Sequence, residues 1–278
     1  MITDKIQHVT QWALPPKIQE TIQYLSTLIF LKDFERKFLN QNKTLRNKHE
    51  GEECYLLATG PSLKKYNLSQ LKFKKTIAVS NFYVHPQCQE IKPDYYCIAP
   101  YHLPITEHAW ANWMMELRNS CSYSTFFFGV SDFKRNFKIF SNLKENVNFI
   151  KFTEWNNSAY KTFNLSKPIP RPQSVSIMAL LVALHLGFSK IYLLGCDHDW
   201  ILHLGKSSHF YEESDHPLVK EGYNEWGDID LEIEFQGYVR LWNQYKSLKN
   251  LAHFNNIEII NSTGAGLLDV FPREKFNS

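Results

Sequence analysis

The chain has 278 residues, of which 44% are hydrophobic and 15% aromatic, and its formal net charge is +3. This composition excludes a disordered chain, and a mild positive charge without a dense Lys/Arg stripe excludes a dedicated nucleic-acid binder. The length fits one large core or one domain with an appendage, so a second full domain is not expected.

The five cysteines are scattered along the chain and have no CxxC spacing. This pattern favours a reducing compartment and argues against a zinc site. No apolar run is long enough for a transmembrane helix, and the N-terminus lacks the basic and apolar segments of a signal peptide. We therefore expect a cytoplasmic protein.

Residues 1–50 are expected to form a helical N-terminal extension that ends in a polar linker at 41–51. Apolar side chains recur at helical spacing over residues 18–38, and lysines and arginines gather after them. Two interpretations are open. The amphipathic helix packs on the domain or on a second subunit, or it makes a peripheral contact with anionic lipid at the inner face of the cell membrane.

Residues 51–278 alternate strand-like and helix-like segments, which predicts an α/β, Rossmann-like domain with a mostly parallel sheet and helices on both faces. Strands are expected near 54–57, 76–79, 95–98, 124–128, 148–152, 190–194 and 257–261. Helices are expected in parts of 61–71, 108–119, 132–143, 174–186 and 230–254.

A small-residue turn, formed by Thr59, Gly60, Pro61, Ser62 and Leu63, follows the first predicted strand. Thr59 or Ser62 can cap the helix expected there, Gly60 lets the backbone approach a ligand, and Pro61 suits a first helical turn. The free amides at such a helix end bind phosphate. The turn is either a phosphate-binding site or an ordinary connection between a strand and a helix.

Three other polar turns follow predicted strands, at Asn81, at 99–102 and at Gly195-Cys196-Asp197. The carboxyl ends of parallel strands meet at one edge of a sheet, where ligands of such folds bind. The four turns therefore predict a nucleotide-type site at that edge.

An irregular insertion at about 198–229 follows the last of these turns, and we expect it to be a lid on the acceptor side. Its histidines include His198, His203, His209 and His216. They can act as a general base, or Asp197, His198 and Asp199 can hold a divalent metal ion. Simple exposure on a polar loop is the remaining interpretation.

The order of three motifs resembles the bacterial sialyltransferases that decorate surface glycans. The motifs are Gly60-Pro61-Ser62-Leu63, the strand-end Asn81, and Arg171-Pro172-Gln173-Ser174 followed by a helix and a strand that ends in Gly195-Cys196-Asp197. The resemblance spans about Glu53 to Phe271. It extends to a wider superfamily that includes the 6-hydroxymethylpterin pyrophosphokinases and the flagellar motility accessory factors.

The resemblance implies a transferase that binds a CMP-linked nonulosonic acid and displaces CMP by direct, inverting attack of a glycan hydroxyl, without a metal. The turn at 59–63 and Asn81 would hold the nucleotide, together with Gly195, Asp197 and His198. Arg171, Gln173 and Ser174 would contact the donor's phosphate, carboxylate or sugar. The family's base histidine precedes the helix expected at 230, where this chain has Tyr223-Asn224-Glu225. The base would then lie upstream, at His209 first and His216 second.

Two alternatives remain open. One is a Mg-dependent pyrophosphokinase of the 6-hydroxymethylpterin type, with Asp197 and Asp199 as metal ligands. The other is a non-catalytic nucleotide-sugar-binding protein in a polysaccharide assembly complex.

Overall fold

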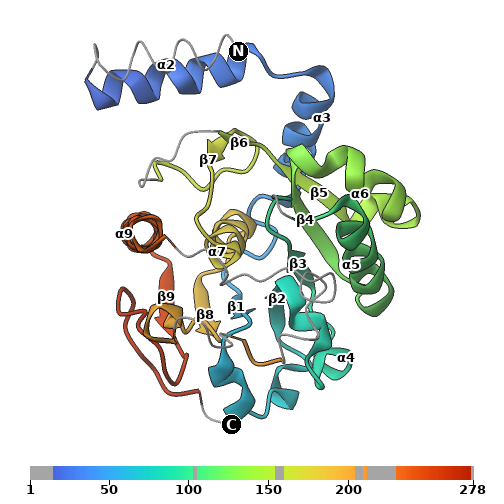
Figure 1. The fold of residues 1–278 in the computed structure, drawn as a ribbon, viewed down its shortest axis with the longest axis vertical. Coiled ribbons are helices and arrows are strands. Elements are labelled where there is room, and N and C mark those ends of the chain that lie inside the picture. Colours follow the sequence, from blue (N-terminus) through green and yellow to red (C-terminus); the bar gives the residue numbers. More distant parts are fainter. Residues whose placement is uncertain (1–14, 103–104, 154–159, 204–208, 212–229, 277–278) are drawn as a thin grey trace.

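The protein is built around a seven-stranded parallel sheet (Figure 1). The computed structural model describes residues 15–102, 105–153, 160–203, 209–211 and 230–276. The sheet has the order β5-β4-β3-β2-β1-β8-β9, and a separate two-stranded sheet pairs β6 with β7. The strands are β1 (Glu53–Leu57), β2 (Lys75–Val79), β3 (Tyr95–Cys97), β4 (Thr125–Gly129), β5 (Val147–Ile150), β6 (Phe152–Thr153), β7 (Ile169–Pro170), β8 (Lys190–Leu194) and β9 (Glu258–Asn261). The predicted Rossmann-like α/β fold is confirmed.

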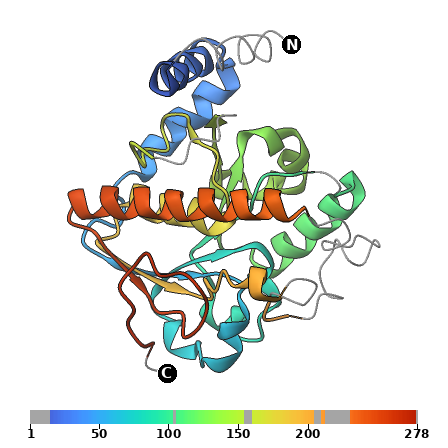
Figure 2. The ribbon, with the colours of Figure 1, turned by 60° about the vertical axis from the view of Figure 1, so that its left-hand side comes forward.

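Helices cover both faces of this sheet. Successive side chains of each strand point to opposite faces, and each face is part of a separate buried core. Leu56 and Ile77 face the core under α7 (Val175–Leu186) and α9 (Leu231–Phe254). Leu57 faces the core under α4 (Cys88–Ile91) and α5 (Glu107–Ser120), and α6 (Phe133–Ile139) packs against α5. Figure 2 shows α9 running across the front of the sheet. Burial of both faces is typical of parallel sheets.

The strand order reverses between β1 and β8. The chain moves from β1 outward through β2, β3, β4 and β5, and then returns to place β8 on the other side of β1. Ligands of open α/β sheets bind beyond the carboxyl ends of the strands at such a switch point. The loops after β1 and β8, which carry Thr59 and Asp197, therefore flank the expected crevice.

The amphipathic segment expected at 18–38 forms two helices, α2 (Pro16–Ile29) and α3 (Asp33–Asn42), instead of one.

The segment at 41–51, which was expected to be a linker, is hydrogen-bonded to the domain. Asn42 Nδ2 donates to the carbonyls of Phe149 and Leu165, and the backbone N–H of Asn47 donates to the carbonyl of His185. Asn42 and His49 are buried against the domain, whereas most of the other polar residues of this segment are exposed. The domain boundary near residue 50 remains a prediction.

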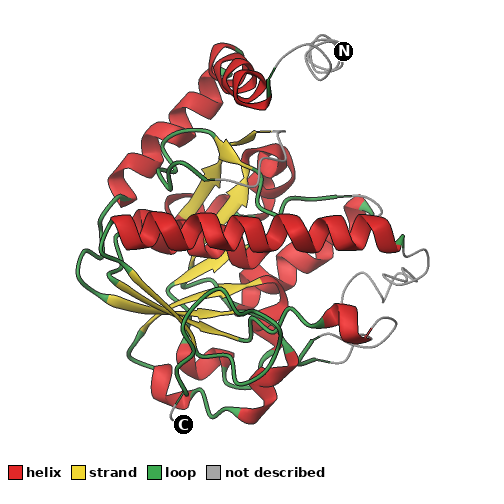
Figure 3. Cartoon of the chain, turned by 90° about the vertical axis from the view of Figure 1, so that its left-hand side faces the viewer, coloured by secondary structure: helices red, strands yellow, loops and turns green. Residues whose placement is uncertain are grey.

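Helix α2 lies away from the sheet (Figure 3) and exposes large apolar side chains at Ile18, Leu25 and Ile29. Within the described part of the chain, no helix is long and apolar enough to cross a membrane. The partner of this exposed face, whether a second subunit or lipid, remains a prediction.

The helix expected in parts of 61–71 forms, but not as an α-helix. Two short 3-10 helices, Pro61–Lys65 and Ser69–Leu71, occupy the segment. Asn67 Oδ1 accepts a hydrogen bond from the N–H of Ser69, and Gln87 Oε1 accepts one from the N–H of Leu68. These side chains take backbone donors that an α-helix needs, so the helix does not propagate. The expected helix at 132–143 is also shorter, and a 3-10 helix at Ser141–Asn146 follows α6.

Candidate functional site

The turn after β1 is fastened to the turn after β8. The N–H of Gly60 donates to the carbonyl of Gly195 at 2.9 Å, and Ser62 Oγ donates to Asp197 Oδ2 at 2.7 Å. A Cβ on Gly60 would lie 1.9 Å from Asp197 Oδ2. The glycine therefore permits the approach of Asp197, rather than of a ligand. Pro61 and Leu63 belong to a five-residue 3-10 helix instead of an α-helix, and phosphate binding at this turn stays a prediction.

Asp197 is held in a buried position at the switch point, with 2% of its surface exposed. Its backbone carbonyl accepts the N–H of Leu267, and Gly266 approaches so closely that a Cβ there would lie 2.1 Å from that carbonyl oxygen. Burial raises the pKa of the carboxyl, against the opposing effect of the Ser62 hydrogen bond. Within the described residues, Oδ1 has no hydrogen-bond partner.

Thr59, Asn81 and His209 lie at the same edge of the sheet as this turn. Thr59 Oγ1 lies 3.2 Å from His209 Nδ1, and the N–H of Phe210 donates to the carbonyl of Thr59. Burial lowers the pKa of His209. Asn81 is fully buried, and neither its amide oxygen nor its nitrogen has a hydrogen-bond partner within the described residues. The second expected base, His216, lies outside the described residues.

His198 lies under α9 in an aromatic cluster. Its Nε2 is 2.7 Å from the hydroxyl of Tyr245, and its ring contacts Trp200 and Trp242. Burial lowers the pKa of His198 to about 4, so the imidazole is neutral at pH 7. Asp199 follows in a half-buried position. No group of three or more His, Cys, Asp or Glu side chains within the described chain is placed to hold a metal ion.

A cavity of about 300 Å³ opens at the same edge, between the turn after β3, the segment before α7, and α9. Its floor is the N-terminal turn of α7, where Ser174 Oγ accepts the N–H of Ile177 and caps the helix. None of the described residues that line this cavity is a carboxylate. The lining residues are Ala99, Pro100, His102, Arg171, Pro172, Gln173, Ser174, Val175, Met178, Arg240 and Gln244.

The segment 171–173 is positioned by α9. Gln244, which is 2% exposed, accepts the N–H of Gln173 at 2.8 Å and donates to the carbonyl of Arg171 at 3.0 Å. Arg240 Nε donates to Gln173 Oε1 at 3.0 Å. The guanidinium of Arg171 is exposed and makes no hydrogen bond to a described residue. Two cations therefore line the cavity, one on each side of Gln173.

The expected site residues thus form two groups. Arg171, Gln173 and Ser174 line the cavity. The residues at the switch point, which do not line it, are Thr59, Gly60, Ser62, Asn81, Gly195, Asp197 and His209.

Sequence reasoning placed the turn at 99–102 at this edge but did not single out His102, and it did not find Arg240 or Gln244. Gln244 is a polar residue between Leu241 and Leu248 in the buried stripe of α9, and this interruption of an apolar face could have indicated it. Arg240 lies one turn before Gln244, but nothing in the local pattern separates it from a solvated arginine.

Similar structures have been solved for a sialyltransferase of Campylobacter jejuni, CstII. Its complex with the substrate analogue cytidine-5'-monophosphate is 15% identical over 81% of this chain and 85% of that chain, with a TM-score of 0.48. Its complex with CMP-3FNeuAc is 16% identical over 81% of this chain and 87% of that chain, with a TM-score of 0.47. No curated protein matches this chain.

The family model described as "6-hydroxymethylpterin diphosphokinase MptE-like" matches residues 30–201. This range includes the turns after β1, β2, β3 and β8 as well as the segment before α7. The family lies within the superfamily that the three motifs resemble. Because the match covers more than half of the chain, this protein belongs to the family of MptE-like proteins.

Proposed function

We propose that this protein is a glycosyltransferase that moves a nonulosonic acid from a CMP-linked donor to a hydroxyl of a cell-surface glycan, with inversion at the anomeric carbon. The observation that carries the proposal is a cavity whose described lining residues include Arg171 and Arg240 and no carboxylate. A CMP-nonulosonate carries a phosphodiester oxygen and a carboxylate on the same carbon, the anomeric carbon at which the reaction occurs. Guanidinium groups are the side chains best suited to oxyanions of this kind.

The size of the cavity supports a donor that spans both groups of residues, those that line the cavity and those at the switch point. About 300 Å³ is at the lower end of the range for ligand pockets. It suits the sugar and the adjacent phosphate, and the nucleoside would then extend toward the switch point. There the unpartnered amide of Asn81 and Asp197 Oδ1 offer both a donor and an acceptor to a base. A buried polar group without a partner costs about 1–3 kcal/mol, which a ligand bond would recover.

In the displacement, the acceptor hydroxyl loses its proton to a base and its oxygen bonds to the anomeric carbon. The bond from that carbon to the phosphate oxygen breaks, and CMP leaves with the electron pair. Negative charge on the leaving group would be stabilised by the guanidinium of Arg171 and by the positive N-terminal end of α7.

The test is calorimetric titration of the protein with CMP, CDP, UMP, ADP and ATP, each with and without magnesium. We expect tight binding of CMP that magnesium does not change. Release of CMP from a CMP-nonulosonate in the presence of an oligosaccharide acceptor would then establish turnover. CMP binding without any turnover would favour a non-catalytic nucleotide-sugar-binding protein.

Arg171→Ala should weaken donor binding, because it removes an exposed cation from the cavity. Arg36→Ala is the matched control, since Arg36 is an exposed arginine on α3. Equal donor affinity in both variants would remove Arg171 from the donor site.

The family match favours a second candidate, a Mg-dependent pyrophosphokinase of the 6-hydroxymethylpterin type. In that reaction Asp197 and Asp199 would hold the ion, since Mg²⁺ is bound through one or two carboxylates together with substrate phosphates. Asp197 Oδ1 fits this use. Magnesium-dependent binding of ATP with no response to CMP, and loss of activity in EDTA, would favour this candidate.

A further inference from the structure

The turn after β3 forms one wall of the cavity. Ala99, Pro100 and His102 line it, opposite Arg171 on the segment before α7. His102 is exposed, so its ring is accessible from the open cavity. The other described histidines near this edge do not line it. His209 lies beside Thr59, and His198 is buried against Tyr245.

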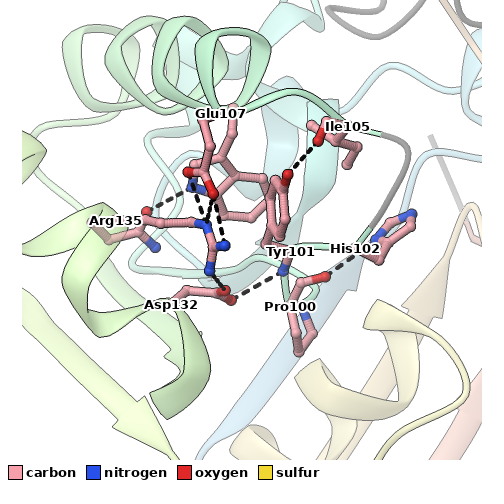
Figure 4. A network of polar contacts seen from close by, with 9 residues as sticks. Pro100, Tyr101, His102, Ile105, Glu107, Asp132 and Arg135 are labelled. Carbon is pink, nitrogen blue, oxygen red and sulfur yellow. Dashed lines mark hydrogen bonds and ion pairs between the residues drawn. The ribbon is translucent and has the colours of Figure 1, made fainter.

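A network behind this wall fixes the turn (Figure 4). The N–H of Tyr101 donates to Asp132 Oδ2 at 3.1 Å, and the Tyr101 hydroxyl donates to the carbonyl of Ile105. The guanidinium of Arg135 lies 3.9 Å from the centre of the Tyr101 ring. Arg135 is itself held by Glu107, to which both Nε and Nη2 donate. The position of residue 102 is therefore set by the 3-10 helix Val130–Asp132 after β4, by α5 and by α6, as well as by its own strand.

The tautomer of His102 follows from its contact with Pro100. Nδ1 lies 3.2 Å from the Pro100 carbonyl oxygen, which can only accept a hydrogen bond. In the neutral ring Nδ1 therefore carries the proton, and Nε2 keeps its lone pair. Within the described residues, no group bonds to Nε2. An imidazole with one nitrogen anchored on a carbonyl and the other directed to solvent is arranged to accept a proton.

Two cations share the lining of this cavity with His102, and ion pairs lie behind its wall. Arg171 and Arg240 line it with His102, and Arg135 is paired with Glu107 and with Asp132 at 3.6 Å. Among the described residues that line the cavity there is no carboxylate, and His102 is the one side chain of a type that serves as a general base.

We infer that His102 is the general base, and that its Nε2 takes the proton of the attacking acceptor hydroxyl. This inference rests on the proposed transferase function. The O–H bond of the acceptor breaks as its oxygen bonds to the anomeric carbon, the proton remains on Nε2, and CMP leaves with its electron pair. Tyr101, Asp132 and Arg135 act as positioning residues. His209, the base expected from the sequence, is the competing assignment.

The experiment compares His102→Ala, His102→Asn, His209→Ala and His108→Gln in the full chain. Asparagine at 102 can still donate to the Pro100 carbonyl and keeps the turn. His108 is the control, because it is an exposed histidine of α5 that pairs with Asn112. Turnover is measured as CMP release with acceptor present, and donor affinity is measured by calorimetry.

We expect kcat to fall on the order of 10² to 10⁴-fold in both His102 variants, with donor affinity within about 2-fold of wild type. Added imidazole should restore part of the turnover of His102→Ala in a saturable manner. His108→Gln should match wild type.

Two results would overturn the assignment of His102 and leave the proposed function standing. One is wild-type turnover in His102→Ala. The other is a His102→Ala variant that loses both turnover and donor affinity and is not rescued by imidazole. A large fall in kcat confined to His209→Ala would assign the base to His209. Absence of turnover and of CMP binding in the wild-type protein would instead reject the proposed function, and the assignment of His102 with it.

Discussion

Asp132 carries a buried carboxyl whose ionisation opposes folding. Its side chain is 1% exposed, and burial raises its pKa to about 6, although the Tyr101 N–H and Arg135 act in the other direction. A folded-state pKa above the unfolded value means that the folded protein binds the proton more tightly. The stabilisation is therefore present at low pH and is lost as the pH rises through about 6.

The magnitude follows from the two pKa values. Against an ordinary aspartate pKa near 4, the shift corresponds to about 3 kcal/mol in total, of which about 1.3 kcal/mol is lost between pH 5 and pH 7. Asp132→Asn keeps an oxygen that can accept the Tyr101 N–H but removes the titration. The free energy of unfolding of wild type minus that of the variant should therefore fall by about 1.3 kcal/mol over this interval.

Urea unfolding of both proteins at pH 5, 6 and 7 measures this difference. Asp33→Asn, on an exposed aspartate of α3, is the control and should run parallel to wild type. A difference between wild type and Asp132→Asn that stays constant with pH would refute the reasoning.

Two further substitutions test the geometry of the site. Gly60→Ala places a Cβ against Asp197 Oδ2 and the Gly195 carbonyl, and should lower the free energy of unfolding by about 1–3 kcal/mol, measured by urea unfolding. Unchanged stability would show that the two turns are not fastened as described. Gln244→Met keeps the side-chain volume but removes two hydrogen bonds to segment 171–173, and should cost about 2 kcal/mol of stability and weaken donor binding measured by calorimetry. Wild-type donor affinity would mean that α9 does not position Arg171.

Much of the fold could be predicted because its signals are local. Short apolar segments bounded by turns predicted each strand of the central sheet. The helix expected in 174–186 ends at Leu186, before Gly187, whose backbone is left-handed with φ of +88°. The expected convergence of the turns after β1, β2, β3 and β8 follows from parallel strands alone. These features need no contact between distant residues.

The site itself was less predictable. The segment after Gly60 has an adequate helix start, with Pro61 at the first helical position, but hydrogen bonds that it donates to Gly195, Asp197 and Gln87 decide its conformation. All three partners lie far along the chain or in another element, so a local pattern cannot register them.

By itself, the sequence determined the alternation of strands and helices, the parallel sheet and the edge at which polar turns gather, because periodicity and turn chemistry act over a few residues. Only the tertiary structure decided which side chains share the cavity. Arg240 and Gln244 reach segment 171–173 from α9, about seventy residues later, and His102 is held by Asp132 through Tyr101. Side-chain packing and hydrogen bonds between distant residues set these positions, and they exist only once the sheet has brought its loops to one edge.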